Sequence, residues 1–449
     1  MHSSTHRYLI DSLRKTFSTG TTIPLKWRYE QLHGIRNLVD DHAEDIIDAL
    51  KQDLGKPALE AKYSEIEYVK TEVKHALKKL PKWTNSQRLR IPFILRPASA
   101  SVRQEPYGVA LIIGPWNFPF QLLITPLISA LAAGNCALLK PSEIAPSTST
   151  LLANLLPEYL DKNAVSVVEG DAETAKSLLS ETFDYIFYTG NSNIGRQILS
   201  AAAQNLTPAT LELGGKCPCI VDGSANLKVA ARRIVWGKFL NAGQTCVAPD
   251  YVLVKNSCEE ELLHYMAEAV KSFYGREPAT SRDYGRIVNS KHFDRLTGLL
   301  TAGTTVTGGL YDRSQLYISP TILRDVSTET AIMQEEIFGP ILPVLRMDNL
   351  ASAADFIRKK PKPLALYMFS SSRQNHKFIL QNTSSGGVCI NDTILQLITP
   401  RLPFGGVGES GMGRYHGKAG FDTFSNPKTI LKRKTWPDPE FRYPPYPEL

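Results

Sequence analysis

Cys246 is the residue whose type and setting favour covalent chemistry. It ends the segment Asn241-Ala242-Gly243-Gln244-Thr245-Cys246, where the apolar, helix-like run 234–240 gives way to a turn containing glycine. Such turns expose the residues that follow them, and a thiolate at an exposed position can attack a carbonyl carbon. Taken alone, a cysteine in a polar loop is more often a bystander than a nucleophile, so other groups must support this interpretation.

Glu212 is a candidate for the base that such a nucleophile needs. It lies between leucines in Leu211-Glu212-Leu213, directly before Gly214-Gly215-Lys216. Flanking leucines favour burial, and burial raises the pKa of a carboxyl group and prepares it to take a proton from water or from a thiol. Taken alone, the segment fits an ordinary strand-end glutamate paired with a lysine better.

Asn117 offers a neutral hydrogen-bond donor in a stiff loop. The loop reads Gly114-Pro115-Trp116-Asn117-Phe118-Pro119 and follows an apolar run, and its two prolines restrict the backbone. A side-chain amide held rigidly there suits a developing oxyanion. Most asparagines in turns bond only to their own backbone, so this residue also needs support from others.

Two further segments have features of a dinucleotide site. Lys140-Pro141-Ser142-Glu143 places a cation and a carboxylate where both could face ribose hydroxyls. Thr189-Gly190-Asn191-Ser192-Asn193-Ile194-Gly195 offers glycines at a strand-to-helix junction, but it lacks the G-x-G-x-x-G fingerprint. This second segment is therefore only weak evidence for a phosphate-binding site.

Short apolar runs alternate with helix-length segments from Tyr107 onward, and both position the residues above. The runs, typical of parallel strands buried on both faces, are 109–113, 137–139, 165–168 and 185–188. The intervening segments, long enough for crossover helices, are 122–133, 147–156, 172–179 and 194–203. Ligands of open α/β sheets bind beyond the carboxyl ends of the strands. The pattern therefore predicts four parallel strands with Asn117, Lys140 and Thr189 at one edge.

The rest of the chain predicts further elements around this unit. Residues 25–80 show amphipathic helical spacing, and residues 214–391 form a second α/β region with strand-like runs at 251–254, 364–369 and 387–390. We expect a dinucleotide-binding domain from 1–82 and 106–212, a catalytic domain from 213–393, a β-rich bridging element from 83–105 and 394–435, and a C-terminal tail from 436–449.

Composition narrows the class of protein. The chain has 449 residues and a net charge of +7, but the basic residues are dispersed, which argues against a nucleic-acid partner. Six cysteines without zinc-ligand spacing predict neither a disulfide scaffold nor a metal site, and they fit the reducing cytoplasm. No apolar stretch has the length of a membrane span or a signal peptide, so we expect no integral membrane segment.

Together the motifs resemble the aldehyde dehydrogenase superfamily, whose landmarks recur in order over residues 25–435. They are Pro115-Trp116-Asn117-Phe118-Pro119, Lys140-Pro141-Ser142-Glu143, Tyr188-Thr189-Gly190, Leu211-Glu212-Leu213-Gly214-Gly215-Lys216, Gly243-Gln244-Thr245-Cys246, Glu336-Ile337-Phe338-Gly339-Pro340 and Pro403-Phe404-Gly405-Gly406. Four segments look closest to those of the class 3 branch, which includes fatty aldehyde dehydrogenases. They are residues 246–251, 411–413, 415–417 and 442–445. Membrane-bound members of that branch carry a hydrophobic C-terminal tail, which this chain lacks, so we expect a soluble, cytoplasmic protein.

The resemblance implies an aldehyde dehydrogenase-like α/β fold, in which a Rossmann-type cofactor domain of five strands joins an α/β catalytic domain and a small β-rich oligomerisation element. It also implies roles for Cys246 as the nucleophile, Asn117 as the oxyanion donor and Glu212 as the base. The cofactor would contact Trp116, Lys140, Glu143, Thr189, Gly190, Ile194, Gly195, Leu213, Glu336 and Phe338. Because Glu143 would repel a 2′-phosphate, NAD is favoured, with NADP possible.

The product, substrate and assembly remain open at this stage. Some relatives pass the acyl group to coenzyme A, but those typically lack a base at the position of Glu212; a non-catalytic protein on the same fold is a further alternative. Apolar residues near the expected entrance (Trp116, Ile394, Leu395, Leu397 and Ile398) favour medium-chain, long-chain, aromatic or polyene aldehydes, although such residues could equally be core or interface. The resemblance also implies a homodimer.

Overall fold

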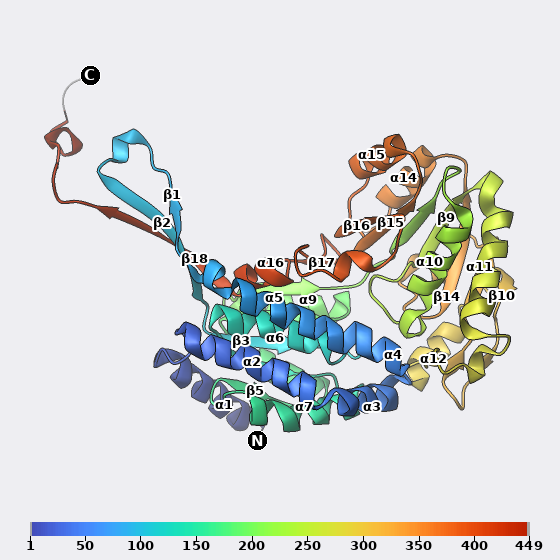
Figure 1. Cartoon of the computed structure of the whole chain (residues 1–449), viewed down its shortest axis with the longest axis horizontal. Helices are drawn as coiled ribbons and strands as arrows, with labels where there is room; N and C mark the ends of the chain where they lie inside the picture. Colours follow the sequence, from blue (N-terminus) through green and yellow to red (C-terminus); the bar gives the residue numbers. More distant parts are fainter. Residues whose placement is uncertain (1, 447–449) are drawn as a thin grey trace.

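The computed structural model describes residues 2–446 and has three parts. Two α/β bodies lie side by side, and a narrow β-arm extends from the first of them (Figure 1). Each body has a separate hydrophobic core, because the buried apolar residues form one cluster around each main sheet.

The first body is built on a six-stranded sheet of order β17-β7-β6-β3-β4-β5. Its strands are β3 (Val109–Ile113), β4 (Cys136–Lys140), β5 (Val165–Val167), β6 (Tyr185–Thr189), β7 (Ala209–Glu212) and β17 (Gly411–Met412). The four predicted strands are present, and β7 adds the fifth parallel strand that the sequence pattern does not reveal. This strand is only four residues long and ends in a glutamate, so it lacks the continuous apolar run that marks the other strands.

Helices cover both faces of this sheet (Figure 1). The four predicted crossover helices are α6 (Gln121–Ala133), α7 (Pro146–Tyr159), α8 (Ala172–Leu179) and α9 (Ser192–Gln204). The helices that precede the sheet are α1 (His2–Ser18), α2 (Leu25–Asp41), α3 (Ala43–Leu54), α4 (Ala58–Ala61) and α5 (Glu67–Thr84). A single π-helical turn, η1 (Lys62–Ile66), joins α4 to α5. The helical character predicted for residues 25–80 is therefore confirmed.

The second body surrounds a seven-stranded sheet of order β10-β13-β14-β9-β8-β15-β16, parallel except for β10. The strands are β8 (Pro218–Val221), β9 (Tyr251–Lys255), β10 (Thr304–Thr307), β13 (Thr321–Arg324), β14 (Ile341–Met347), β15 (Ala365–Phe369) and β16 (Gly387–Ile390). The helices are α10 (Leu227–Phe239), α11 (Glu259–Tyr274), α12 (Ser290–Thr297), α13 (Ala331–Gln334), α14 (Leu350–Arg358) and α15 (Arg373–Asn382). A two-stranded ribbon pairs β11 (Tyr311–Asp312) with β12 (Tyr317–Ile318).

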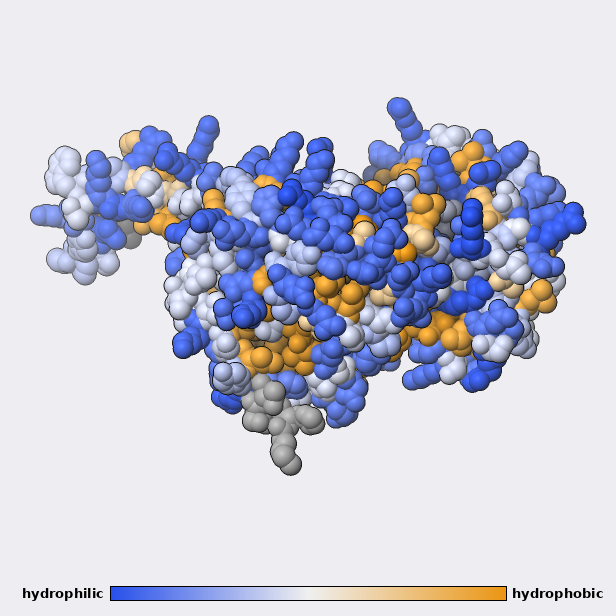
Figure 2. Space-filling view, turned by 60° about the horizontal axis from the view of Figure 1, so that its bottom comes forward, coloured by the Kyte–Doolittle hydropathy of each residue, from blue (hydrophilic) through white to orange (hydrophobic). Residues whose placement is uncertain are grey.

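The arm is a three-stranded antiparallel sheet of β1 (Gln87–Leu89), β2 (Ala98–Pro106) and β18 (Ser425–Arg433). Figure 2 shows it at the left, with apolar side chains among polar ones. The structure differs from the prediction that 394–435 forms a single bridging element. Gly411 in β17 pairs with Glu212 in the first sheet, and the short helix α16 (Gly417–Thr423) packs on α6, so 411–423 belongs to the first body.

Across residues 2–446, no helix is both long enough and apolar enough to span a bilayer.

Candidate active site

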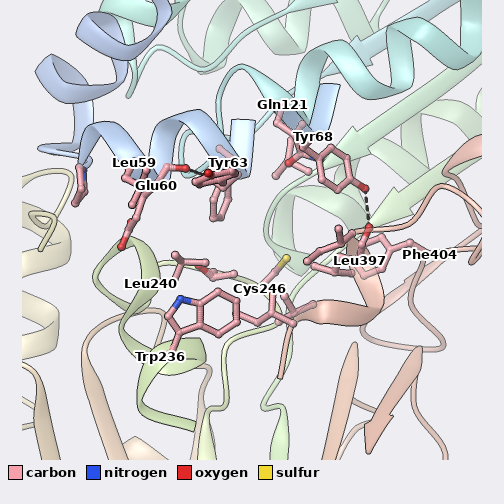
Figure 3. Close-up of a pocket in the computed structure, with 18 of the residues that line it drawn as sticks. Leu59, Glu60, Tyr63, Tyr68, Gln121, Trp236, Leu240, Cys246, Leu397 and Phe404 are labelled. Atoms are coloured by element: carbon pink, nitrogen blue, oxygen red, sulfur yellow. Dashed lines mark hydrogen bonds between the residues drawn. The ribbon is translucent and has the colours of Figure 1, made fainter. Parts of the chain in front are cut away.

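A strained turn presents Cys246 to a cavity between the two bodies. After α10, the short helix η3 (Leu240–Gly243) contains Asn241 and Ala242, both with a φ of 53°. Left-handed backbone at residues other than glycine stores strain, which is found most often at functional sites. The turn redirects the chain, and Figure 3 shows the sulfur of Cys246 pointing into the cavity.

The cavity has a volume of about 530 Å³ and is mainly apolar. Its wall comes from both bodies and includes Leu59, Tyr63, Tyr68, Phe118, Leu122, Trp236, Leu240, Phe273, Ile394, Leu397, Ile398, Phe404 and Tyr415. Ile394, Leu397 and Ile398, which the sequence analysis expects near the substrate entrance, line this cavity. Trp116 and Leu395 do not line this cavity.

The thiol of Cys246 is held in its neutral form. Burial raises its pKa, and the nearby carboxyl groups of Glu336 and Glu212 raise it further, while the backbone N–H groups of Cys246 and Val247 oppose this shift. A thiolate therefore forms here only if a base removes the proton.

Glu212 is a buried carboxyl group at the end of β7. Only 2% of the residue is exposed, and neither of its oxygens has a hydrogen-bond partner among the residues that the structure describes. Burial raises its pKa well above the ordinary value, and the Arg414 guanidinium counteracts part of this shift. Lys216 does not pair with Glu212, because its ammonium group lies 2.5 Å from the carboxylate of Asp250 instead. The Glu212 carboxyl group is thus unpaired within the described residues, and its raised pKa makes its ionised form a stronger base than an exposed carboxylate.

Asn117 connects the loop after β3 to the turn before Cys246. Its side-chain Nδ2 donates to the backbone carbonyl of Gln244 over 3.0 Å, and its own carbonyl accepts from Nδ2 of Asn241 over 2.9 Å. A side-chain amide has two N–H donors, so one remains for a ligand oxygen. Asn117 is buried, and its position relative to the cysteine turn is fixed by both bonds.

The register of the first sheet brings Lys140 and Thr189, both predicted to contact the cofactor, to one edge. Ile113 lies opposite Lys140, and Thr189 lies opposite Glu212. Nζ of Lys140 donates to Glu143 over 2.8 Å. The hydroxyl of Thr189 is buried and has no hydrogen-bond partner within residues 2–446. This edge therefore presents a nearly buried cation and an unused hydroxyl group to a ligand.

Glycines in the segment after β6 allow close packing at the same edge. A Cβ atom on Gly195 would lie only 2.9 Å from Leu213, so α9 lies directly against the chain that leaves β7. Asn191 caps α9 by accepting from the backbone N–H of Ile194, which is partly exposed. Gly190 has no room for a side chain either, because a Cβ atom there would collide with the hydroxyl of Tyr188.

Glu336 and Phe338 approach this edge from the second body. The carboxyl group of Glu336 lies against Gly214, where a Cβ atom would collide with Oε2. Burial is the main cause that raises the pKa of Glu336 to about 8. The rings of Phe338 and Trp116 meet edge to face, with centroids 5.3 Å apart. Glu335, the adjacent acid, is exposed and lies 3.5 Å from Arg295.

The residues at the carboxyl edge of the first sheet, together with Glu336 and Phe338 from the second body, fit a dinucleotide. Polar groups without partners, glycines that permit close approach and a helix N-terminus lie together at the carboxyl edge of a parallel sheet, which is where such ligands bind. The Glu212 carboxyl group ends a strand at this edge, and both Glu212 and Glu336 lie near enough to the Cys246 thiol to influence its pKa.

Residues 3–430 match the family model described as the aldehyde dehydrogenase family. The chain belongs to this family. It is therefore an NAD(P)-dependent aldehyde dehydrogenase, as the motifs predicted, and relatives named as members of family 3 confirm the predicted branch.

Three relatives of this aldehyde dehydrogenase are informative. A Canis lupus familiaris protein named "aldehyde dehydrogenase, dimeric NADP-preferring" is 45% identical, and the match covers 97% of each chain. The 4,4'-diaponeurosporen-aldehyde dehydrogenase of Staphylococcus aureus is 46% identical over 96% of this chain and 94% of that protein. A solved structure described as the substrate-bound state of Staphylococcus aureus AldH has a TM-score of 0.96 and 45% identity, and covers 98% and 96% of the two chains. The predicted fold is thereby confirmed.

Several residues at the aldehyde dehydrogenase site carry no signal in the sequence. Tyr68 lines the cavity, and its hydroxyl lies 2.8 Å from Nε2 of His416 and donates to the carbonyl of Leu397 over 3.2 Å (Figure 3). Burial lowers the pKa of His416 to about 3, so its ring is neutral. Residues 68 and 416 are too far apart in the chain for a pattern to link them. Only the apolar spacing around Tyr68 marks its helix.

Proposed function

We propose that this enzyme oxidises an apolar aldehyde to the carboxylic acid, with Cys246 as the nucleophile and Glu212 as the base. One observation carries the proposal: the sulfur of Cys246 faces a mainly apolar cavity of about 530 Å³ and lies within electrostatic reach of the buried Glu212 carboxyl group, which has no hydrogen-bond partner in the described part of the chain. An aldehyde with an apolar body can therefore place its carbonyl carbon at the sulfur.

The first half of the reaction forms a carbon–sulfur bond. Glu212 takes the thiol proton, the sulfur of Cys246 attacks the carbonyl carbon, and the carbonyl oxygen becomes an oxyanion. The free N–H of the Asn117 amide and the backbone N–H of Cys246 stabilise that charge. A bound nicotinamide cofactor supplies the acceptor for the hydride that the carbon loses, which leaves a thioester on Cys246.

The second half releases the acid. After Glu212 has released the thiol proton to solvent, it takes a proton from water, the hydroxide attacks the thioester, and the carbon–sulfur bond breaks with the electron pair returning to sulfur. Burial supports this role, because a carboxyl group with a raised pKa accepts a proton more readily than an exposed one.

In this proposal the cofactor binds at the carboxyl edge of the first sheet, which Glu336 and Phe338 approach from the second body. Lys140, Glu143 and Glu336 would hold the two riboses, and the N-terminus of α9 would face the phosphates. We favour NAD, because the Glu143 carboxylate would repel a 2′-phosphate. NADP remains possible, because Lys140 would attract one and the canine relative is named as NADP-preferring.

The substrate class follows from the aromatic and aliphatic wall. Medium-chain, long-chain, aromatic and polyene aldehydes all fit it, and the Staphylococcus aureus relative is named for a polyene aldehyde. A panel of such aldehydes, assayed with NAD and with NADP, tests this assignment. Equal catalytic efficiency with charged semialdehydes would contradict it.

Transfer of the acyl group to coenzyme A is the main alternative. The presence of Glu212 favours hydrolysis, and product analysis with and without coenzyme A separates the two outcomes. A chain that forms no NADH or NADPH with any aldehyde class would instead be a non-catalytic member of the family.

We also propose a cytoplasmic homodimer. All six cysteines are unpaired, which fits a reducing compartment. The arm exposes Phe93 and Ile94, which a partner subunit would cover, and the canine relative is named as dimeric. The domain boundaries expected from the sequence remain part of this proposal, apart from residues 411–423, which pack on the first body.

A further inference from the structure

A buried ion pair lies behind the oxyanion donor. The ammonium group of Lys56 contacts the carboxylate of Glu65, and both side chains have 0% exposure. Lys56 follows Gly55, the left-handed C-cap of α3, and Glu65 lies in the π-helical turn η1. π-Helical turns are rare and occur frequently at functional sites.

The pair holds both ends of one short turn. Nζ of Lys56 donates to the backbone carbonyl of Asn117 over 3.1 Å. Oε2 of Glu65 accepts from the backbone N–H of Gln121 over 2.8 Å. The Lys56 ammonium also lies 4.1 Å from the centroid of the Phe118 ring. Residues 117–121 are therefore fixed at their first and last backbone groups by two charges that bind each other.

Stability alone does not explain this arrangement. Desolvating two charges is costly, and an apolar pair of similar volume often stabilises a protein as well or better. What an apolar pair cannot do is bind the Asn117 carbonyl and the Gln121 N–H. The backbone carbonyl of Asn117 accepts from two donors, the Lys56 ammonium group and the Asn241 side-chain amide. Together they leave the peptide group of Asn117 a single orientation.

We propose that Lys56 and Glu65 are positioning residues that hold the side-chain amide of Asn117 where the oxyanion forms. The inference rests on the proposed role of Asn117 and extends it to residues that touch neither substrate nor cofactor. Loss of the pair loosens the turn and moves the amide by a fraction of an ångström, which is enough to lower the rate of an oriented reaction by up to about 100-fold.

The experiment is a double-mutant cycle between the pair and Asn117. The variants are K56M/E65M, which replaces both charges by apolar groups of similar volume, N117A, and the triple variant. We expect K56M/E65M to lower kcat for the aldehyde about 10- to 100-fold, with an unchanged KM for the cofactor. In the N117A background the same change should lower kcat less than about 2-fold, because the group that it positions is absent.

Other outcomes would overturn the proposal in distinguishable ways. Equal effects of K56M/E65M in both backgrounds would show a general defect of the fold. Full activity of N117A would remove the oxyanion role on which the inference rests, and full activity of K56M/E65M alone would remove the positioning role. If K56M/E65M does not fold, E65Q takes its place in the cycle, since its amide oxygen still accepts from Gln121 N–H. R14M is the matched control, because Arg14 pairs with Asp184 at the opposite end of the sheet; its kcat should not change.

Discussion

The thiol of Cys217 donates to the backbone carbonyl of Cys246 over 3.4 Å. The two cysteines are neighbours in space but differ in access. Cys217 is fully buried in the second core, whereas Cys246 is partly exposed in the wall of the cavity. Burial raises the pKa of both thiols, but only Cys246 can be reached by an aldehyde.

Replacement of Cys246 by alanine should abolish aldehyde oxidation. Without the sulfur no thioester forms, and we expect kcat to fall about 1000-fold or more, measured as NADH or NADPH production. Cys258, next to the N-terminus of α11 and away from the cavity, provides the control. Normal activity in C246A together with a loss in C258A would reject the assignment.

Replacement of Glu212 by glutamine should impair both acylation and hydrolysis. The E212Q enzyme should show no burst of reduced cofactor and should turn over at least about 100-fold more slowly, because the amide can deprotonate neither the thiol nor water. Rapid-mixing measurements of cofactor reduction check this. A burst of one reduced cofactor per active site would assign the thiol proton to another base, and an unchanged steady-state rate would exclude Glu212 from both steps. E335Q, at an exposed position, is the control.

Replacement of Trp236 by alanine should reduce the preference for long aldehydes. Trp236 lines the cavity from α10, so its loss removes apolar contact with the far part of a chain. We expect the kcat/KM for decanal to fall about 10-fold and that for propanal to change little. V229A, on the same helix and outside the cavity wall, should leave both values unchanged. Equal losses for both aldehydes in W236A would argue against the apolar cavity as the chain-binding site.

Stability should depend on pH through Glu72. Burial raises the pKa of Glu72 from 4.5 to about 7. Between these two pH values the folded state keeps a proton that the unfolded state loses. Stability therefore falls as pH rises from about 4.5 to about 7. E72Q keeps the neutral form and should be more stable than the wild type by about 1–3 kcal/mol at pH 8.5, with little difference at pH 4.5. Urea denaturation at both values tests this, with the half-exposed Glu67→Gln as control.

The arm should determine the oligomeric state. Ile94 is 80% exposed in the loop between β1 and β2, and a charge there would oppose burial against a second subunit. We expect I94D to sediment and scatter light as a monomer, whereas the wild type behaves as a dimer. L206D changes a residue that is 90% exposed outside the arm and should leave the dimer intact. A wild-type monomer would exclude the proposed assembly.

The local sequence predicted those strands and helices whose hydrophobic pattern lies within one continuous segment. The strands at 109–113 and 185–188 and the helix at 172–179 follow from apolar runs and helical spacing, because burial on two faces imposes a continuous run. The fifth parallel strand, β7, was not identified from its residues, since four residues ending in a carboxylate lack the continuous apolar run of the other strands.

The sequence by itself determined the residue types of the chemistry: a cysteine after a glycine turn, a glutamate between leucines and an asparagine between prolines. The tertiary structure decided their environment. Only it shows that Glu212 lacks a hydrogen-bond partner in the described chain, that Lys216 binds Asp250, and that Lys56 and Glu65 meet beneath Asn117. The physical reason is that a pKa, a cavity or a buried ion pair depends on groups distant in the sequence, and no local pattern records which of them the fold brings together.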